Sequence, residues 1–83
     1  MFESTYIPDG DLIVKESIRQ LRRAMGAEEI TKTALAPKLG VSRQTLSGRF
    51  SDGDMKLSEF VAASIAAGRK PSDLIATAEG KQS

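Results

Sequence analysis

The sequence predicts one all-α domain that contains five helices. Apolar residues recur three or four positions apart, which is the period of an amphipathic helix and not of a strand. Residues that cap helices precede these segments, and glycines follow several of them. Because 83 residues suffice for one core, we expect a single domain at residues 11–79, with an arm at 1–10 and a disordered tail at 80–83.

The first helix is expected after the turn Pro8-Asp9-Gly10, with Asp11 as its N-terminal cap and Gly26 at its end. Apolar residues at helical spacing predict its buried face: Val14, Ile18, Leu21 and Met25. A second face carries four basic residues: Lys15, Arg19, Arg22 and Arg23. We expect this basic face to be solvated, as such faces most often are, and the alternative is that it faces a DNA partner.

The second helix is expected to follow Thr31, a good N-cap, and to end at Gly40. Leu35 and Leu39 then fall on one face of it. Pro37 lies inside this helix, where it removes one backbone hydrogen bond and clashes with the preceding turn. We therefore expect the helix to start late or to bend.

The third helix is expected to follow its cap Ser42, with Leu46 and Phe50, four positions apart, on its buried side. Residues 51–54, Ser-Asp-Gly-Asp, have the composition of a loop. This places a short polar helix between two turns.

The fourth helix is expected at residues 59–67, after an apolar Leu57 and the cap Ser58, and Gly68 ends it. Pro71-Ser72-Asp73 then begins a short fifth helix.

The composition excludes several classes of site. The chain has no cysteine and no histidine, so disulfides, a structural zinc site and histidine-based acid–base catalysis are not expected. Two Asp-Gly-Asp tripeptides, at 9–11 and 52–54, lack the further ligands of a calcium loop. No nucleophile, base and orienting group can be combined, so we expect no enzyme, no cofactor and no metal.

The positive charge is concentrated in the middle of the chain. The net charge is only +1, but residues 15–56 contain nine basic and five acidic residues, a modest indication of a polyanionic partner. The longest apolar stretch, residues 60–67, is too short to span a bilayer, and the acidic N-terminus lacks the pattern of a signal peptide. We expect a cytoplasmic protein that does not contact a membrane.

Residues 32–51 have the spacing of a helix-turn-helix. Two helices that cross steeply need a small residue at their contact and a left-handed turn between them, which Ala36 and Gly40 supply. They also need apolar residues on both sides of the turn: Leu35, Leu39, Val41 and Leu46. Ser42 then caps the second of the two helices.

The run Leu39-Gly40-Val41-Ser42-Arg43-Gln44-Thr45-Leu46-Ser47, together with Leu57-Ser58-Glu59-Phe60, resembles the lambda-repressor-like (Cro/C1, Xre-type) helix-turn-helix family. The resemblance covers roughly residues 12–76 and implies a compact five-helix domain whose helices two and three form the motif. The size is most similar to that of a phage Cro-like or repressor-like protein. Two residues depart from the pattern: Pro37, and Gly48, where the family often has a longer polar or basic side chain.

The resemblance implies that the third helix enters the major groove of DNA. The expected base-reading residues are Arg43, Gln44, Ser47 and, with less support, Thr45. Arginine bonds guanine and glutamine bonds adenine. Alternatively, Arg43 holds a phosphate and Ser47 is solvated.

Four further residues are expected to contact phosphates: Lys32, Ser42, Arg49 and Lys56. Lys32 opens the second helix, whose N-terminus attracts anions. For Arg49 the alternative is a salt bridge to Asp52, or solvent. Lys38 is expected to be solvated.

The expected partner is double-stranded DNA with a near-palindromic operator, bound by a homodimeric repressor that occludes the promoter and has no small-molecule effector. The candidate dimer residues are Phe2, Tyr6, Val61 and Ile65, although a broad apolar face on the fourth helix also fits deep burial. The alternative function is a protein-interaction module, an antitoxin, anti-repressor or adaptor with the same fold.

Overall fold

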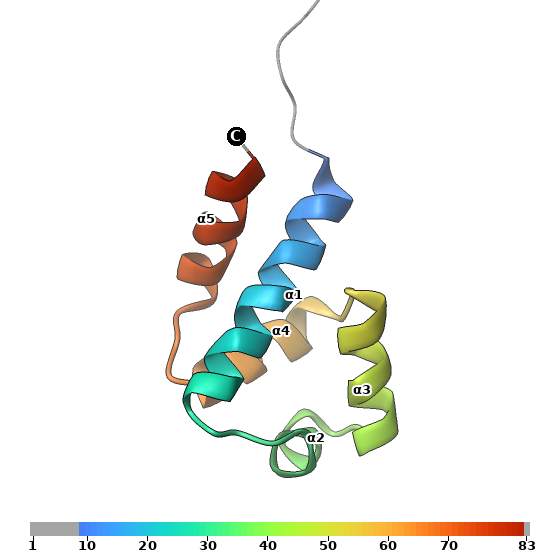
Figure 1. Cartoon of the computed structure of the whole chain (residues 1–83). Coiled ribbons are helices and arrows are strands. Elements are labelled where there is room, and N and C mark those ends of the chain that lie inside the picture. The colour runs from blue at the N-terminus through green and yellow to red at the C-terminus, as the bar shows by residue number, and fades with distance from the viewer. Residues whose placement is uncertain (1–8, 83) are drawn as a thin grey trace, which may run out of the picture.

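Five α-helices account for most of the chain in a computed structural model, which describes residues 9–82. The helices are α1 (Gly10–Ala27), α2 (Lys32–Leu39), α3 (Arg43–Asp52), α4 (Leu57–Ala66) and α5 (Pro71–Gln82). Within residues 9–82 there is no strand, so the all-α class with five helices is confirmed. Figure 1 shows α5 alongside α1, with α3 on the other side of α1.

The core lies where α1 packs against α3, α4 and α5, and α2 joins it through its contacts with α3 and α4. Ile18, Leu21 and Met25 of α1 are buried as predicted, and they belong to one cluster with residues from every other helix: Leu35, Ala36, Leu46, Phe50, Phe60, Ala63 and Leu74. Val14 differs from the prediction, because it is 41% exposed. It lies one helical turn before Ile18, where α1 forms the wall of an apolar groove instead of the core.

Both predicted ends of α1 are wrong by a few residues. The cap is Asp9, whose carboxylate accepts a hydrogen bond from the backbone N–H of Asp11 at 2.9 Å. Gly26 lies inside the helix, and Glu29 takes the left-handed backbone conformation with a φ of 57°. The N–H of Ile30 then bonds the carbonyl of Met25 at 2.8 Å, which satisfies the end of the helix.

The caps of α2 were predicted correctly. The Thr31 hydroxyl accepts a hydrogen bond from the N–H of Ala34 at 3.1 Å, and Gly40 follows the helix with a φ of 72°. Pro37 does not delay the start of α2, which begins at Lys32 directly after its cap. Since Pro37 stands in the second half of α2, the residues before it can form the first turn without the bond that proline removes.

The N-terminus of α4 differs from the prediction. The helix begins at Leu57 and its N-cap is Lys56, not Ser58. The carboxylate of Glu59 accepts a hydrogen bond from the backbone N–H of Lys56 at 3.0 Å, so a residue within the first turn satisfies this donor. Gly68 follows α4 in the left-handed conformation, with a φ of 71°.

The C-terminal boundary also differs. We expected a tail from Gly80 onward, but α5 continues as a helix to Gln82. Residues 1–8, which include Phe2 and Tyr6 of the expected arm, lie outside the described residues. None of the helices found in residues 9–82 combines the length and apolar character that crossing a membrane requires.

Candidate functional site

The connection between α2 and α3 is a tight corner. Gly40 adopts the left-handed conformation, and the N–H of Val41 bonds the carbonyl of Ala36 at 3.1 Å. Figure 1 shows α2 nearly end-on where α3 is seen from the side, so the two helices cross steeply. Leu35 and Leu46 are almost completely buried on the two sides of the corner, which fixes both helices to the core.

The N-terminus of α3 projects three polar side chains into solvent. Arg43, Gln44 and Thr45 are exposed, and Ser47, about one turn further, is half-buried. Arg43 and Gln44 form no side-chain hydrogen bond or ion pair with any other residue in the range 9–82. These two side chains are therefore available to a partner.

Ser42 caps α3 and is tied to Thr45. Its hydroxyl oxygen accepts a hydrogen bond from the backbone N–H of Thr45 at 3.0 Å, and its O–H donates to the Thr45 hydroxyl at 2.9 Å. The predicted cap is confirmed. The hydroxyl groups of Ser42 and Thr45 thus already form hydrogen bonds with each other's residue, whereas the Arg43 guanidinium and the Gln44 amide form none within residues 9–82.

Arg49 forms an ion pair with Glu59 of α4. The Nε and Nη2 atoms of Arg49 lie 3.0 and 3.4 Å from the two carboxylate oxygens of Glu59. The Arg49 side chain is 34% exposed and that of Glu59 only 7%. The structure thus pairs Arg49 with Glu59, whereas Asp52 was the partner considered from the sequence.

Glu59 is held in its charged form by this arrangement. The hydrogen bond from Arg49 lowers the pKa of the Glu59 carboxyl below its ordinary value, and the backbone N–H of Lys56 acts in the same direction. Burial of Glu59 opposes the two effects without cancelling them. Sequence reasoning missed Glu59, although its place three residues after Lys56 is that of the glutamate in a capping box.

The remaining candidate phosphate contacts lie at the starts of two different helices. Lys32, at the start of α2, is half-buried, and its Nζ lies 5.9 Å from the centroid of the Phe50 ring, within reach of a cation–π interaction. Lys56 is exposed at the start of α4.

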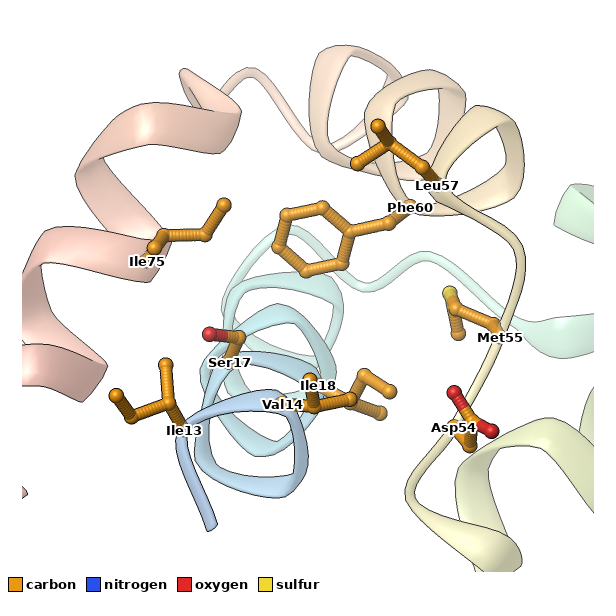
Figure 2. A pocket seen from close by; sticks show the side chains of 9 residues that line it. All are labelled: Ile13, Val14, Ser17, Ile18, Asp54, Met55, Leu57, Phe60 and Ile75. Carbon is orange, nitrogen blue, oxygen red and sulfur yellow. The ribbon is translucent and has the colours of Figure 1, made fainter. Parts of the chain in front are cut away.

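A separate apolar surface involves α1, α4 and α5. Figure 2 shows a groove of about 270 Å³ with the Phe60 ring at its centre, Ile75 of α5 on one side and Met55 on the other. Leu57 lines the groove and is 71% exposed, and Ile65, two helical turns further along α4, is 65% exposed. Val61, between them, is half-buried. The two dimer candidates on α4 thus lie on an exposed apolar stripe that continues from the groove.

Over the described part of the chain, no group of three or more acidic residues, the only candidate ligand types present, is placed to hold a metal ion.

Comparisons with known proteins give no match: no protein-family model, no curated protein and no solved structure is significantly similar to this chain. Function is therefore inferred from the chain's own residues.

Proposed function

We propose that this chain is a sequence-specific double-stranded DNA-binding regulator, in which α2 and α3 form a helix-turn-helix and α3 enters the major groove. The observation that carries the proposal is the exposed end of α3, where Arg43 and Gln44 form no side-chain hydrogen bond or ion pair within residues 9–82, on a helix that Leu46 and Phe50 attach to the core. A rigid helix with free polar side chains at its N-terminal end is what major-groove reading requires. The resemblance to lambda-repressor-like proteins agrees with this function.

Base reading is assigned to four residues of α3. The Arg43 guanidinium has the geometry to donate two hydrogen bonds to guanine, and the Gln44 amide to exchange two with adenine. Ser47 lies on the same face, one turn further. Thr45 is a weaker reader, because its hydroxyl already accepts a hydrogen bond from Ser42.

Phosphate binding is assigned first to Lys32, because it combines a cationic side chain with the N-terminal end of α2. Lys56 holds the backbone on the far side of α3. Arg49 contributes through whichever of its donors Glu59 leaves free, and Ser42 contacts phosphate only by giving up its bond to Thr45.

The functional unit is proposed to be a homodimer that represses by occluding an operator. The apolar stripe on α4 supplies a surface that a second copy covers. It consists of the exposed Leu57 and Ile65, with the half-buried Val61 between them. A two-fold dimer places two α3 helices about 34 Å apart, which matches successive major grooves on one side of a near-palindromic site.

A second candidate function is a protein-interaction module with the same fold. The apolar groove of Figure 2 favours it, since a groove lined by Val14, Leu57 and Phe60 suits an apolar segment of another protein. In that case the groove matters more than Arg43.

Titration of a mixed-sequence DNA duplex at two salt concentrations separates the two functions. A DNA-binding protein releases counterions when it neutralises phosphates, so we expect its affinity to fall steeply as salt rises. Selection of bound sites from a random duplex pool then identifies the operator and its symmetry. Absence of binding at low salt contradicts the DNA-binding proposal and favours the interaction module.

A further inference from the structure

A basic cleft lies between α1 and the C-terminal part of α3. It has a volume of about 330 Å³ and is lined by three cationic side chains of α1, together with Phe50 and the turn after α3: Lys15, Arg19, Arg22, Phe50, Asp52 and Gly53. Asp52 is the acidic residue among these lining residues. The positive charges thus outnumber the negative charge in the cleft.

Lys32 of α2 extends this cluster past the Phe50 ring. Its Nζ lies 5.9 Å from the centroid of that ring, and the same ring lines the cleft with the cations of α1. Phe50 of α3 thus lies near Lys32 and also lines the cleft that contains the three cations of α1. We call Lys15, Arg19, Arg22 and Lys32 the basic row.

Two contacts within the chain bear on the basic row. A Cβ atom built on Gly53 lies 2.8 Å from Cγ of Lys15, so glycine leaves room for the aliphatic stem of Lys15 against the turn. Arg19 has an ion pair with Glu16 at 3.6 Å, but its side chain remains 71% exposed. An exposed pair of this kind is weak and leaves Arg19 available to a stronger anion.

The basic row has dimensions that suit a nucleic-acid backbone. Lys15 and Arg22 lie seven positions apart on α1, a rise of about 10 Å, which equals the rise along the DNA axis of about three nucleotides of one strand. The row and the Arg49–Glu59 pair involve different neighbours of α3, because the cleft is formed with α1 and that pair with α4.

We propose that the basic row binds consecutive backbone phosphates of double-stranded DNA on the α1 side of α3. The proposal rests on the DNA-binding function above and extends its interface to α1, whose basic face was expected from the sequence to be solvated, with DNA contact as the alternative. Lys32 links the start of α2 with the cleft, because it stands at that helix end and its Nζ lies near the Phe50 ring, which lines the cleft.

The test measures how the affinity of the full chain depends on salt. The probe is a fluorescent mixed-sequence duplex of about two helical turns, titrated by anisotropy in KCl from about 50 to about 200 mM. The main variant is the double substitution Arg19→Gln/Arg22→Gln, and Lys32→Gln is the single row variant. Lys81→Gln, at the exposed end of α5, is the control that removes one charge, as Lys32→Gln does. Arg22→Lys keeps the charge, and thermal melting followed by circular dichroism verifies that each variant is folded.

The double variant is expected to lower the slope of log affinity against log salt by about one unit for each phosphate that is no longer neutralised, that is by about two. Arg22→Lys and Lys81→Gln are expected to keep the slope of the unmodified chain. If a folded double variant keeps that slope while Lys32→Gln lowers it, α1 does not bind phosphates. The proposal of the basic row is then overturned, and the DNA-binding function stands. If Lys81→Gln lowers the slope as much as a single row variant does, the effect is one of net charge and the row is again overturned. If the unmodified chain binds no duplex, both proposals fall.

Discussion

The guanidinium of Arg49 and the carboxylate of Glu59 join the C-terminal half of α3 to the first turn of α4, with N–O distances of 3.0 and 3.4 Å. The same carboxylate accepts the backbone N–H of Lys56. One buried side chain therefore fixes the turn between α3 and α4 through three N–H donors, two of Arg49 and one of Lys56. Among the residues that the structure describes, nothing restrains the side chains of Arg43 and Gln44 at the opposite end of α3 in this way, so the helix is anchored at one end and exposed to a partner at the other.

Replacement of Glu59 by glutamine is expected to lower the free energy of unfolding by about 1–2 kcal/mol. A neutral amide weakens the hydrogen bonds from Arg49 and from the backbone N–H of Lys56, and it leaves Arg49 without a counter-charge. Urea unfolding followed by circular dichroism measures this loss. The matched control is Glu28→Gln, which breaks the exposed pair with Arg69, where the two side chains are 49% and 36% exposed. We expect that change to cost less than about 0.5 kcal/mol. Equal losses in the two variants contradict the role of the buried pair.

The stability that Glu59 contributes is expected to depend on pH. Its pKa in the folded chain is lowered from 4.5, chiefly by the hydrogen bond from Arg49. The unfolded chain therefore binds a proton to Glu59 at higher pH than the folded chain does, so this contribution is complete above the unfolded pKa and is lost as the pH falls through the folded one. The difference in unfolding free energy between the unmodified chain and Glu59→Gln should be full near neutral pH and shrink in strongly acidic buffer. A difference that stays constant argues against the charge as its source.

The sequence predicts the corner between α2 and α3 well, because each signal there is local. Thr31 and Ser42 bond donors only three residues away, and the left-handed turn falls on a glycine, Gly40. The end of α1 is harder to predict. Its left-handed residue is Glu29, a type with no special preference for that conformation, while the nearby Gly26 remains helical.

The candidate site was only partly predictable for a similar reason. Exposure of Gln44 follows from its place opposite Leu46 on α3, whereas Arg43, three residues before Leu46 and on its side of the helix, is exposed at the first position of α3. Arg49 and its partner Glu59 are ten positions apart, and the turn at Gly53 brings them together. No periodic pattern in the sequence encodes the geometry of that turn. The approach of Lys32 to the Phe50 ring is likewise a result of packing between two helices.

The left-handed backbone of Gly40 predicts a large difference between two glycine substitutions. Gly40→Ala places a Cβ on a residue with a φ of 72° and is expected to destabilise the fold by about 1–2 kcal/mol. Gly48→Ala places one inside α3 where no atom lies within 4 Å, and is expected to stabilise it by about 0.5–1 kcal/mol. Thermal melting of the two variants measures both effects, and a corner that tolerates alanine at residue 40 as readily as at residue 48 contradicts this account.

Introduction of charge into the α4 stripe is expected to separate the proposed dimer. Ile65→Glu places a carboxylate at one end of the proposed apolar contact, where its desolvation opposes association. Light scattering during gel filtration should then report a monomer, with weaker binding to a palindromic duplex. Leu12→Glu changes another exposed apolar residue, on α1 and 47% exposed, and should leave the dimer intact. A monomeric unmodified chain, or a dimer that survives Ile65→Glu, contradicts the assigned surface.

The different roles of Arg43 and Lys32 can be separated by their effects on sequence preference. Arg43→Ala should weaken binding to the preferred site by about 1–3 kcal/mol and relax the preference at one base pair, because a base contact contributes only where the correct base is present. Lys32→Ala should weaken binding to all duplexes about equally and reduce the salt dependence, because it leaves one phosphate without its cation. Affinities measured on a set of single-base variants of the selected site distinguish the two patterns. The control is Lys38→Ala, which removes an exposed lysine of α2 and is expected to change neither the sequence preference nor the salt dependence. If Arg43→Ala weakens every sequence equally, Arg43 contacts phosphate and base reading passes to Gln44 and Ser47.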